Sequence, residues 1–425
     1  MIKSKYRFDT LQIHAGSRPD PSTGARQVPI YQNTAYVFKS ILQAEALFDL
    51  KELGHIYSRL SNPTVSVLQE RIATLEGGIG AVCTSSGHAA QILALFPLMS
   101  PGDNLIASTR LYGGTIQQFS NTIKKFGWNA KFVDIDNFDQ VKQSIDKKTK
   151  AIFCESISNP GGHITDLIEI GKLSKIFKIP LIVDNTAASP FLCNPFKFGA
   201  DLIVHSTTKY MSGNGTSLGG AVIDSGNFNW SETGKFQSLS AEEPGYHGLK
   251  FHDTFGPYAF IIYSIAVSLR DLGMTMAPQN AFHTLLGLET LSLRMKKHVS
   301  NARKIANWLE KHPKIEKVTY AGLESSEYFE MAKPILPKGA GALFTISLKD
   351  GYEACIKMIN KLNIFSHVSN LGDTRSLIIH PASTVHRQLT EEQQINAGLA
   401  PNVIRLSIGI EDPKDLIHDL SNALE

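Results

Sequence analysis

Cysteine is scarce in this sequence, with only four among 425 residues: Cys83, Cys154, Cys193 and Cys355. No two of them have the spacing of a CxxC pair, so the sequence lacks the usual signature of a metal or redox pair. A secreted domain held together by disulfides is therefore disfavoured, and we expect a protein of the reducing cytoplasm.

Long hydrophobic runs and an excess charge of one sign are also missing. The longest apolar stretches, such as YAFIIYSIAV at residues 258–267, are too short to span a bilayer. The N-terminal MIKSKYRFDT lacks the apolar stretch of a signal peptide. Lysine and arginine total 42 against 39 aspartate and glutamate, a net charge of +3. This near balance indicates neither a nucleic acid nor a membrane as partner.

The composition is that of an ordinary globular protein, long enough for two or three domains. Hydrophobic residues make up 42% and charged residues 19% of the chain, which argues against disorder. The first sixty residues have little periodicity and several turn signals. We therefore expect residues 1–61 to form an extended N-terminal arm that reaches a neighbouring subunit.

From residue 62 onward, helix and strand signals alternate. The segment SNPTVSVLQERIATLEGG predicts a helix that is capped by Ser61 or Asn62 and ends at Gly77 and Gly78. Seven further runs are strand candidates, and most of them are continuously apolar, as in strands that are buried on both faces of a mostly parallel sheet. These runs are 80–85, 104–108, 130–135, 151–156, 180–185, 201–206 and 219–224. The sequence therefore predicts an α/β fold, a seven-stranded sheet with helices on both faces.

The domain boundaries follow from where this alternation stops. We expect an α/β domain over residues 62–275 and a smaller C-terminal α+β domain over residues 276–425. Residues 225–256 show no clear period and are interpreted as a long ordered insertion, which in compact domains is often functional. Its aromatic residues suit either a cover over the entrance of a site or a contact between subunits.

Polar side chains follow several of the predicted strands, where ligands bind in open α/β sheets. Ser206, Thr208 and Lys209 come directly after one strand. Two hydroxyls suit a phosphate, and a lysine shielded among apolar neighbours can lose enough basicity to form a Schiff base. Asp184 ends another strand and can keep a pyridinium nitrogen protonated, as pyridoxal 5'-phosphate (PLP) requires. Taken alone, a solvated surface lysine and a helix-capping aspartate are the alternatives.

Two further motifs fit the same kind of ligand. Ser86, Gly87 and His88 precede an apolar helix, whose open N–H groups and dipole favour an anion. Tyr112 lies in the motif LYGGT and can stack on an aromatic cofactor ring. The alternatives are an ordinary capped helix without a ligand and a half-buried core tyrosine.

As an ordered set, these motifs resemble the Cys/Met-metabolism PLP-dependent enzymes, the cystathionine γ-synthase-like group of fold type I. The matching motifs are YSRLSNPT at 57–64, SSGHAA at 85–90, LYGGT at 111–115, VDNT at 183–186, DLIVHSTTKY at 201–210, and the later SLIIHPAST and IRLSIGIED. The resemblance covers nearly the whole chain and implies PLP as cofactor.

The resemblance implies a role for each matching residue around the cofactor. Lys209 would form the Schiff base, Asp184 would pair with the pyridine nitrogen, and Tyr112 would stack on the ring; these three are the expected catalytic residues. The other expected cofactor-binding residues of the same pocket are Ser86, Gly87, His88, Asn159, Ser206 and Thr208. Glu155 is a weaker candidate.

The resemblance also implies a shared site and a substrate pocket. Tyr57 and Arg59 would bind the phosphate of a neighbouring subunit, which makes a dimer obligatory and suggests a homotetramer built from dimers. Arg405 would hold the α-carboxylate of the substrate, for which its bidentate fork is suited. Asn370 and Tyr57 complete the expected substrate-binding residues.

Within the group, the resemblance is to the O-acetylhomoserine sulfhydrylases. His88 in SGHAA, Gly114, Asn370 in NLGD and the insertion containing PGYHGLKFHDTFGP carry it. It implies γ-replacement on O-acetyl-L-homoserine with sulfide or another sulfur donor to give L-homocysteine and acetate in methionine biosynthesis. A thiol and a sulfur-carrier protein are the alternatives to free sulfide. The alternatives are a methionine γ-lyase, a cystathionine γ-synthase, or a non-catalytic protein of the same fold. Succinyl and phosphoryl esters of homoserine remain open.

Two groups of polar residues are assigned no chemistry. His247 and His252 lack a clustered third ligand, so we expect loop histidines and no metal site. The basic run at residues 294–298 predicts a solvated helix face.

Overall fold

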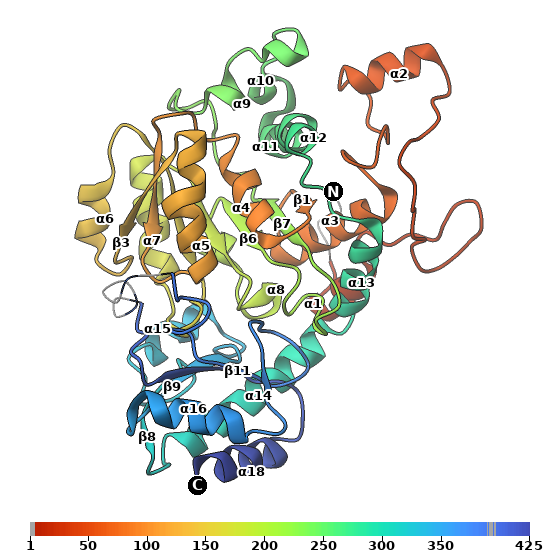
Figure 1. Cartoon of the computed structure of the whole chain (residues 1–425). Coiled ribbons are helices and arrows are strands. Elements are labelled where there is room, and N and C mark those ends of the chain that lie inside the picture. The colour runs from red at the N-terminus through yellow and green to blue at the C-terminus, as the bar shows by residue number, and fades with distance from the viewer. Residues whose placement is uncertain (1–4, 389, 391–393, 395–396) are drawn as a thin grey trace.

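The computed structural model describes residues 5–388, 390, 394 and 397–425, and two β-sheets organise this part of the chain (Figure 1). The strands of the first sheet are β1 (Gly80–Thr84), β2 (Asn104–Ser108), β3 (Asn129–Val133), β4 (Thr149–Glu155), β5 (Leu181–Asp184), β6 (Leu202–His205) and β7 (Gly220–Asp224). They lie in the order β1-β7-β6-β5-β4-β2-β3, and all pairs are parallel except those made by β7. The prediction of a mostly parallel sheet is thus confirmed, with each strand within two residues of its predicted ends.

The helices surround and connect the sheets. The α-helices are α1 (Phe8–His14), α2 (Ile41–Phe48), α3 (Pro63–Glu76), α4 (Gly87–Leu95), α5 (Gly113–Gln117), α6 (Phe138–Ser144), α7 (Leu167–Phe177), α8 (Ser189–Leu192), α9 (Gln237–Ser240), α10 (Phe251–Phe255), α11 (Ala259–Tyr263), α12 (Arg270–Leu272), α13 (Pro278–Leu288), α14 (Leu291–Leu309), α15 (Phe329–Ile335), α16 (Gly351–Lys361) and α18 (Pro413–Leu424). The short 3₁₀ and π segments are η1 (Gln118–Thr122), η2 (Ile123–Phe126), η3 (Pro195–Phe198), η4 (Pro244–Tyr246), η5 (Gly256–Tyr258) and η6 (Ser264–Leu269). Within the described residues, every helix is too short or too polar to cross a bilayer.

The first sheet is buried on both faces because its successive side chains enter two different cores. On β4, Ile152 belongs to the core that includes side chains of α3 and α7. Its neighbour Phe153 belongs to the core that includes side chains of α4 and α11. Since adjacent residues of a strand point to opposite faces, a continuously apolar run is what such a strand requires.

The helix predicted from residue 62 is α3, and the local rules determine both of its ends. The side chain of Asn62 accepts a hydrogen bond from the backbone of Thr64, and Pro63 occupies the first turn. Gly77 ends the helix in the left-handed region, at φ 80°.

The second sheet lies below the first in Figure 1, with α16 and α18 on its outer side. Its strands are β8 (Ile315–Thr319), β9 (Leu343–Leu348), β10 (Ser366–His367), β11 (Leu377–Ile379) and β12 (Val403–Ser407), in the order β10-β11-β12-β9-β8. One hydrophobic core continues from Ile152 of the first sheet to Phe344 of the second. The two sheets are therefore packed together, and their junction is fixed.

The long helix α14 corrects one expectation. The basic run at residues 294–298 lies on this helix, but Arg294 is only 9% exposed and His298 is fully buried. Arg294 donates hydrogen bonds to the carbonyl oxygens of Tyr210 and Gly287. The prediction of a solvated face is wrong for these two residues, because backbone carbonyl groups bind their side chains. It holds for Lys296 and Lys297, which are exposed.

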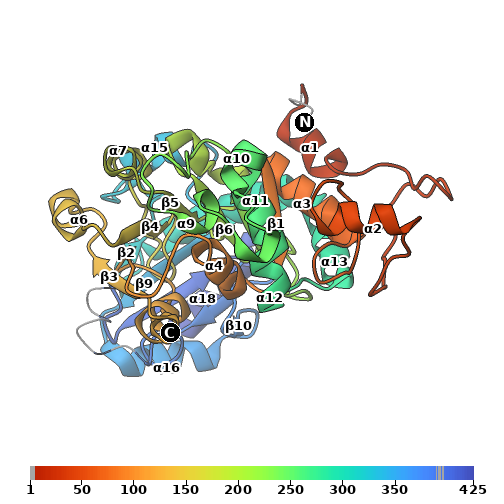
Figure 2. The ribbon, with the colours of Figure 1, turned by 90° about the horizontal axis from the view of Figure 1, so that it is seen from above.

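The N-terminal segment divides into a docked part and a projecting part. Phe8 of α1 packs edge-on against Phe191, with 5.3 Å between ring centroids. Residues 30–57, which include α2, stand away from the body in both views (Figures 1 and 2). Several apolar side chains of this part are exposed, among them Val37 at 99% and Leu53 at 86%.

The insertion at residues 225–256 is ordered and contains α9, η4 and α10. Its side chains Trp230, Phe236 and Phe251 are fully buried, and Trp230 stacks on Phe260 of α11 at 5.5 Å. Aromatic packing therefore holds the insertion against the helices that follow it.

Candidate active site

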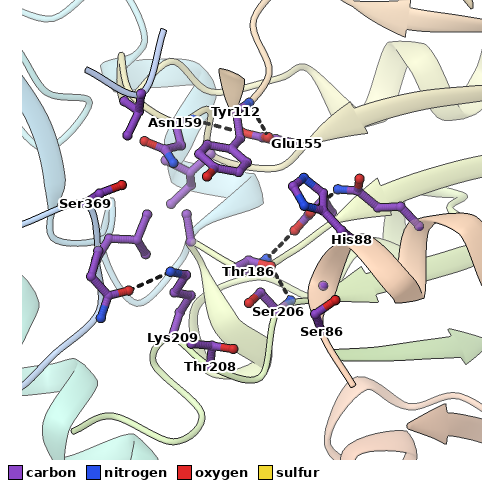
Figure 3. A pocket seen from close by; sticks show the side chains of 18 of the residues that line it. Ser86, His88, Tyr112, Glu155, Asn159, Thr186, Ser206, Thr208, Lys209 and Ser369 are labelled. Carbon is purple, nitrogen blue, oxygen red and sulfur yellow. Dashed lines mark hydrogen bonds between the residues drawn. The ribbon is translucent and has the colours of Figure 1, made fainter. Parts of the chain in front are cut away.

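A pocket of about 210 Å³ lies at the carboxyl ends of β4, β5 and β6, where the first sheet meets the second (Figure 3). Most residues singled out from the sequence line it: Ser86, Gly87, His88, Tyr112, Glu155, Asn159, Asp184, Ser206, Thr208, Lys209, Asn370 and Arg405. The junction of the sheets thus brings together residues that lie more than 300 positions apart in the sequence, from Ser86 to Arg405.

Lys209 lies in the turn that follows β6, on the wall of the pocket. Its Nζ donates a hydrogen bond of 2.6 Å to Oδ1 of Asn370, a neutral acceptor. Burial, and then the charge of Arg405, lower the pKa of Lys209 to about 8. A lysine in this state has a substantial neutral fraction near neutral pH, which a nucleophilic or proton-transferring amine needs.

Asp184 ends β5 and is held by two neighbours. Its Oδ1 accepts a hydrogen bond from the backbone N–H of Thr186, and its Oδ2 accepts one from Nε2 of Gln91 at 3.4 Å. Gln91 is itself held by Thr115. The carboxylate is therefore oriented within the pocket, available to a cationic partner on the ligand.

The N-terminus of α4 closes one side of the pocket (Figure 3). Ser86 caps the helix by accepting a hydrogen bond from the backbone of Ala89. A Cβ at Gly87 would lie 2.8 Å from Cβ of Ser206, so glycine permits this close approach. Ser206 donates its backbone N–H to Thr186, and Thr208 exchanges hydrogen bonds with the backbone of Gly219. A helix N-terminus beside two hydroxyl side chains is suited to an anion.

Two aromatic rings, one of them on α4, also line the pocket. The rings of Tyr112 and His88 are stacked, with 5.8 Å between centroids and 24° between planes. A Cβ at Gly114 would lie 2.5 Å from the Tyr112 ring, so glycine leaves room for this stack. Burial lowers the pKa of His88, which favours the neutral imidazole.

Glu155 fixes the backbone of two other pocket residues, Tyr112 and Asn159. Its two carboxyl oxygens accept hydrogen bonds from the backbone N–H groups of Tyr112, at 2.7 Å, and Asn159, at 2.8 Å. Burial and the nearby Asp184 raise the pKa of Glu155 well above its usual value. Its contacts are those of a positioning residue, which explains why the sequence pattern alone gave it no clear role.

Arg405 enters the pocket from β12 of the second sheet. Its Nη1 donates to Oδ1 of Asn159 and its Nη2 to the carbonyl of Asn370. The guanidinium is buried, and its Nε has no hydrogen-bond partner within the described residues. A buried cation with an unused donor is suited to a carboxylate ligand.

Tyr57 and Arg59 are not brought into this pocket by their own chain. Tyr57 ends the projecting segment and Arg59 follows it, and neither lines the pocket. The insertion at residues 225–256 does not line it either, so the expectation that the insertion covers the entrance is not met within one chain. Among the described residues, no group of His, Cys, Asp or Glu side chains is arranged to hold a metal ion.

Sequence reasoning missed several residues of the pocket, among them the polar Gln91 and Thr186. Gln91 interrupts the apolar run AAQILALF of α4, and a polar residue in such a run was a signal that could have been used. Thr186 lay inside the quoted motif VDNT without a role. Its side chain joins the ends of β5 and β6 by accepting from Ser206.

The pocket fits the expected cofactor, PLP. Lys209 would carry it, the Asp184 carboxylate would face its ring nitrogen, and the N-terminus of α4 would hold its phosphate. Nε2 of His88 is buried without a hydrogen-bond partner within the described chain, beside the Tyr112 ring on which the cofactor ring would stack. A polar atom left unpaired in this position is explained by a ligand that the pocket is shaped to receive.

Comparisons with known proteins agree with this fit. The family model described as Cys/Met metabolism PLP-dependent enzyme matches residues 9–425. The O-acetyl-L-homoserine sulfhydrylase of Leptospira meyeri is 44% identical, with 99% of this chain and 97% of that protein covered. O-acetyl-L-homoserine sulfhydrylase 1 of Thermus thermophilus is 46% identical, with 98% and 100% covered.

A solved structure is also similar over its full length. It is a protein of Campylobacter jejuni assigned as an O-acetylhomoserine (thiol)-lyase, with a TM-score of 0.96 and 46% identity, covering 99% of this chain and 100% of that one. That structure contains a lysine modified with a pyridoxyl monophosphate group. With a family match across almost all of its length, this chain belongs to the Cys/Met metabolism PLP-dependent enzymes.

Proposed function

We propose that this enzyme catalyses γ-replacement on O-acetyl-L-homoserine with a sulfur nucleophile, giving L-homocysteine and acetate. One observation carries the proposal: Lys209, Asp184 and Arg405 line a single pocket. An amine of lowered basicity, a carboxylate and a buried guanidinium are what a PLP enzyme needs to bind an α-amino acid. The named relatives act on O-acetylhomoserine and supply the substrate class.

The protein's residues divide the work of the reaction. When bound, PLP would stabilise the negative charge that develops on the α-carbon of the substrate. Lys209 would remove the proton from the α-carbon and transfer the proton at the β-carbon, because its amine titrates near neutral pH. Asp184 would keep the ring nitrogen protonated. Arg405 would bind the α-carboxylate of the substrate and so orient the bond between the α-carbon and its proton.

The leaving group departs from the γ-carbon of the substrate. Tyr112 stands on the wall of the pocket, with its backbone fixed by Glu155. Its phenol would lie over the cofactor and limit the access of water. Replacement rather than elimination requires that water be kept out until the sulfur nucleophile arrives.

Several wider assignments belong to the same proposal. The chain divides into an arm (1–61), a PLP-binding domain (62–275) and a C-terminal domain (276–425). Tyr57 and Arg59 act on a neighbouring subunit's phosphate, so the working form is a homo-oligomer, a tetramer built from dimers, in the cytoplasm. Both side chains are exposed and neither lines the pocket of its own chain, which supports this assignment. Sulfide is the proposed donor, and a sulfur-carrier protein is the alternative.

Product analysis tests the proposed reaction. The purified enzyme is incubated with O-acetyl-, O-succinyl- or O-phospho-L-homoserine, each with sulfide, and separately with L-methionine. We expect homocysteine and acetate from the acetyl ester and little 2-oxobutyrate from any mixture. Rapid formation of 2-oxobutyrate and methanethiol from methionine would identify a γ-lyase instead. A protein without the visible absorbance of bound PLP, and without turnover, would contradict any catalytic role.

A further inference from the structure

Arg59 is hydrogen-bonded to the carboxyl end of a helix. Its Nη1 donates a hydrogen bond of 2.9 Å to the carbonyl oxygen of Arg270. Its own carbonyl accepts a hydrogen bond from Oγ1 of Thr275. Both the backbone and the guanidinium of Arg59 are thus attached to residues more than 200 positions later, although the side chain is exposed.

The carbonyl that holds Arg59 belongs to the last turn of a continuous helical run. The elements α11, η6 and α12 follow one another without a break, and Gly273 ends the run at φ 69°. The carboxyl end of a helix carries partial negative charge on carbonyl groups that no later N–H satisfies. This end therefore attracts the guanidinium of Arg59 by charge as well as by the hydrogen bond.

The insertion, in turn, holds this helix end. The hydroxyl of Tyr246 donates to the carbonyl of Ala266 at 2.9 Å and accepts from Nη1 of Arg270 at 3.0 Å. The Arg270 guanidinium lies over the Tyr246 ring, 5.4 Å from its centroid. The ring packs edge-on against the fully buried Phe251. Tyr246 thereby connects the aromatic core of the insertion to the turn of helix that binds Arg59.

We propose that the insertion at residues 225–256 supports Arg59, with Tyr246 and Arg270 as positioning residues for the phosphate contact that Arg59 makes on a neighbouring subunit. This inference rests on the proposed role of Arg59 in the function above. One N–H of the Arg59 guanidinium is used by Arg270, and the guanidinium lies over the Tyr57 ring, 5.6 Å from its centroid. These two contacts restrict the orientation of the guanidinium, whose other N–H groups remain for an anion. A preoriented guanidinium loses less rotamer freedom on binding an anion, so the phosphate binds more tightly.

The test compares two ligands that differ only in the phosphate. Apoenzymes of the wild type, Tyr246→Phe and Arg270→Gln are titrated with PLP and with pyridoxal, and bound ligand is measured by absorbance. Each variant removes the hydrogen bond between Tyr246 and Arg270. We expect PLP to bind roughly three- to tenfold more weakly in both variants. Pyridoxal affinity should not change, because Arg59 acts only on the phosphate.

Tyr263→Phe is the matched control. Tyr263 packs against Phe251 in the same aromatic cluster, but its hydroxyl bonds to Ser238 and not to Arg270. Its ratio of PLP to pyridoxal affinity should equal that of the wild type. A general loosening of the insertion would instead weaken both ligands alike in all three variants, and this result would overturn the proposal.

A double-variant cycle separates the inference from the function on which it depends. Arg59→Ala should itself lower the ratio of PLP to pyridoxal affinity, and adding Tyr246→Phe to it should lower the ratio no further. If Arg59→Ala leaves the ratio unchanged, the shared phosphate site is wrong. If Arg59→Ala lowers the ratio but Tyr246→Phe does not, or if the two effects add, the supporting role of the insertion is wrong.

Discussion

Arg405 donates a hydrogen bond of 2.9 Å from Nη1 to Oδ1 of Asn159, although 246 residues separate them in the sequence. Arg405 lies on β12 of the second sheet, and Asn159 follows β4 of the first. This contact therefore connects the two sheets inside the pocket. Because Asn159 is neutral, the charge of the buried guanidinium is left for a ligand.

Replacing Arg405 tests its proposed contact with the substrate carboxylate. Arg405→Lys keeps a charge but loses the planar fork, so KM for O-acetyl-L-homoserine should rise roughly 10- to 100-fold. The absorbance of bound PLP should persist, because Lys209 and the phosphate site are intact. Steady-state kinetics with spectra of each variant measure both. An unchanged KM would place the substrate carboxylate elsewhere.

The lowered basicity of Lys209 predicts a pH dependence of cofactor capture. Only the neutral amine attacks the aldehyde of PLP, and its fraction grows as the pH rises toward the pKa of about 8. The rate of PLP capture by the apoenzyme should therefore increase about tenfold per pH unit below that value and level off above it. Stopped-flow absorbance measures the rate. If the rate of PLP capture still rises steadily above pH 9, the pKa of Lys209 is not lowered. Lys209→Ala, the control, should show neither the absorbance of covalently bound PLP nor turnover.

Loss of the Asp184 carboxylate should affect chemistry more than binding. Asp184→Ala removes the partner of the ring nitrogen in a dry site, which should cost about 3 kcal/mol or more of transition-state stabilisation, roughly 100-fold in kcat. The variant should still bind PLP through Lys209 and the phosphate site. Comparing kcat with the PLP content of the same preparation checks this. A rate near that of the wild type would assign the role to another group.

Mixing inactive variants tests whether the site is shared between subunits. Lys209→Ala and Arg59→Ala chains are each expected to be inactive or strongly impaired. If subunits are shuffled into mixed dimers, one site of each mixed dimer is wholly wild type, and roughly a quarter of full activity should return. Mass spectrometry of the mixture confirms the exchange. Mixed dimers without activity would show that Arg59 serves its own chain.

The first sheet and most of the polar pocket residues could be predicted without the structure. Continuous apolar runs were sufficient to locate the strands, because each such strand is covered on both faces. In β2, for example, all five residues are buried. The helix α3 followed from its cap at Asn62 and its stop at Gly77, which are local interactions. The lysine, aspartate and hydroxyl residues followed strand ends in recognisable motifs, so their shared edge could be inferred from topology.

Contacts between groups that are distant in the sequence could not be predicted, because they depend on how the elements pack. Arg294 was misjudged because its partners are backbone carbonyls of Tyr210 and Gly287, which a count of charges does not reveal. The insertion has no periodicity because it is held by aromatic packing against α11 rather than by regular secondary structure. Its contact with Arg59, through Tyr246 and Arg270, joins three separate parts of the chain. Local sequence patterns report the preferences of neighbouring residues, whereas contacts of this kind depend on how whole elements pack.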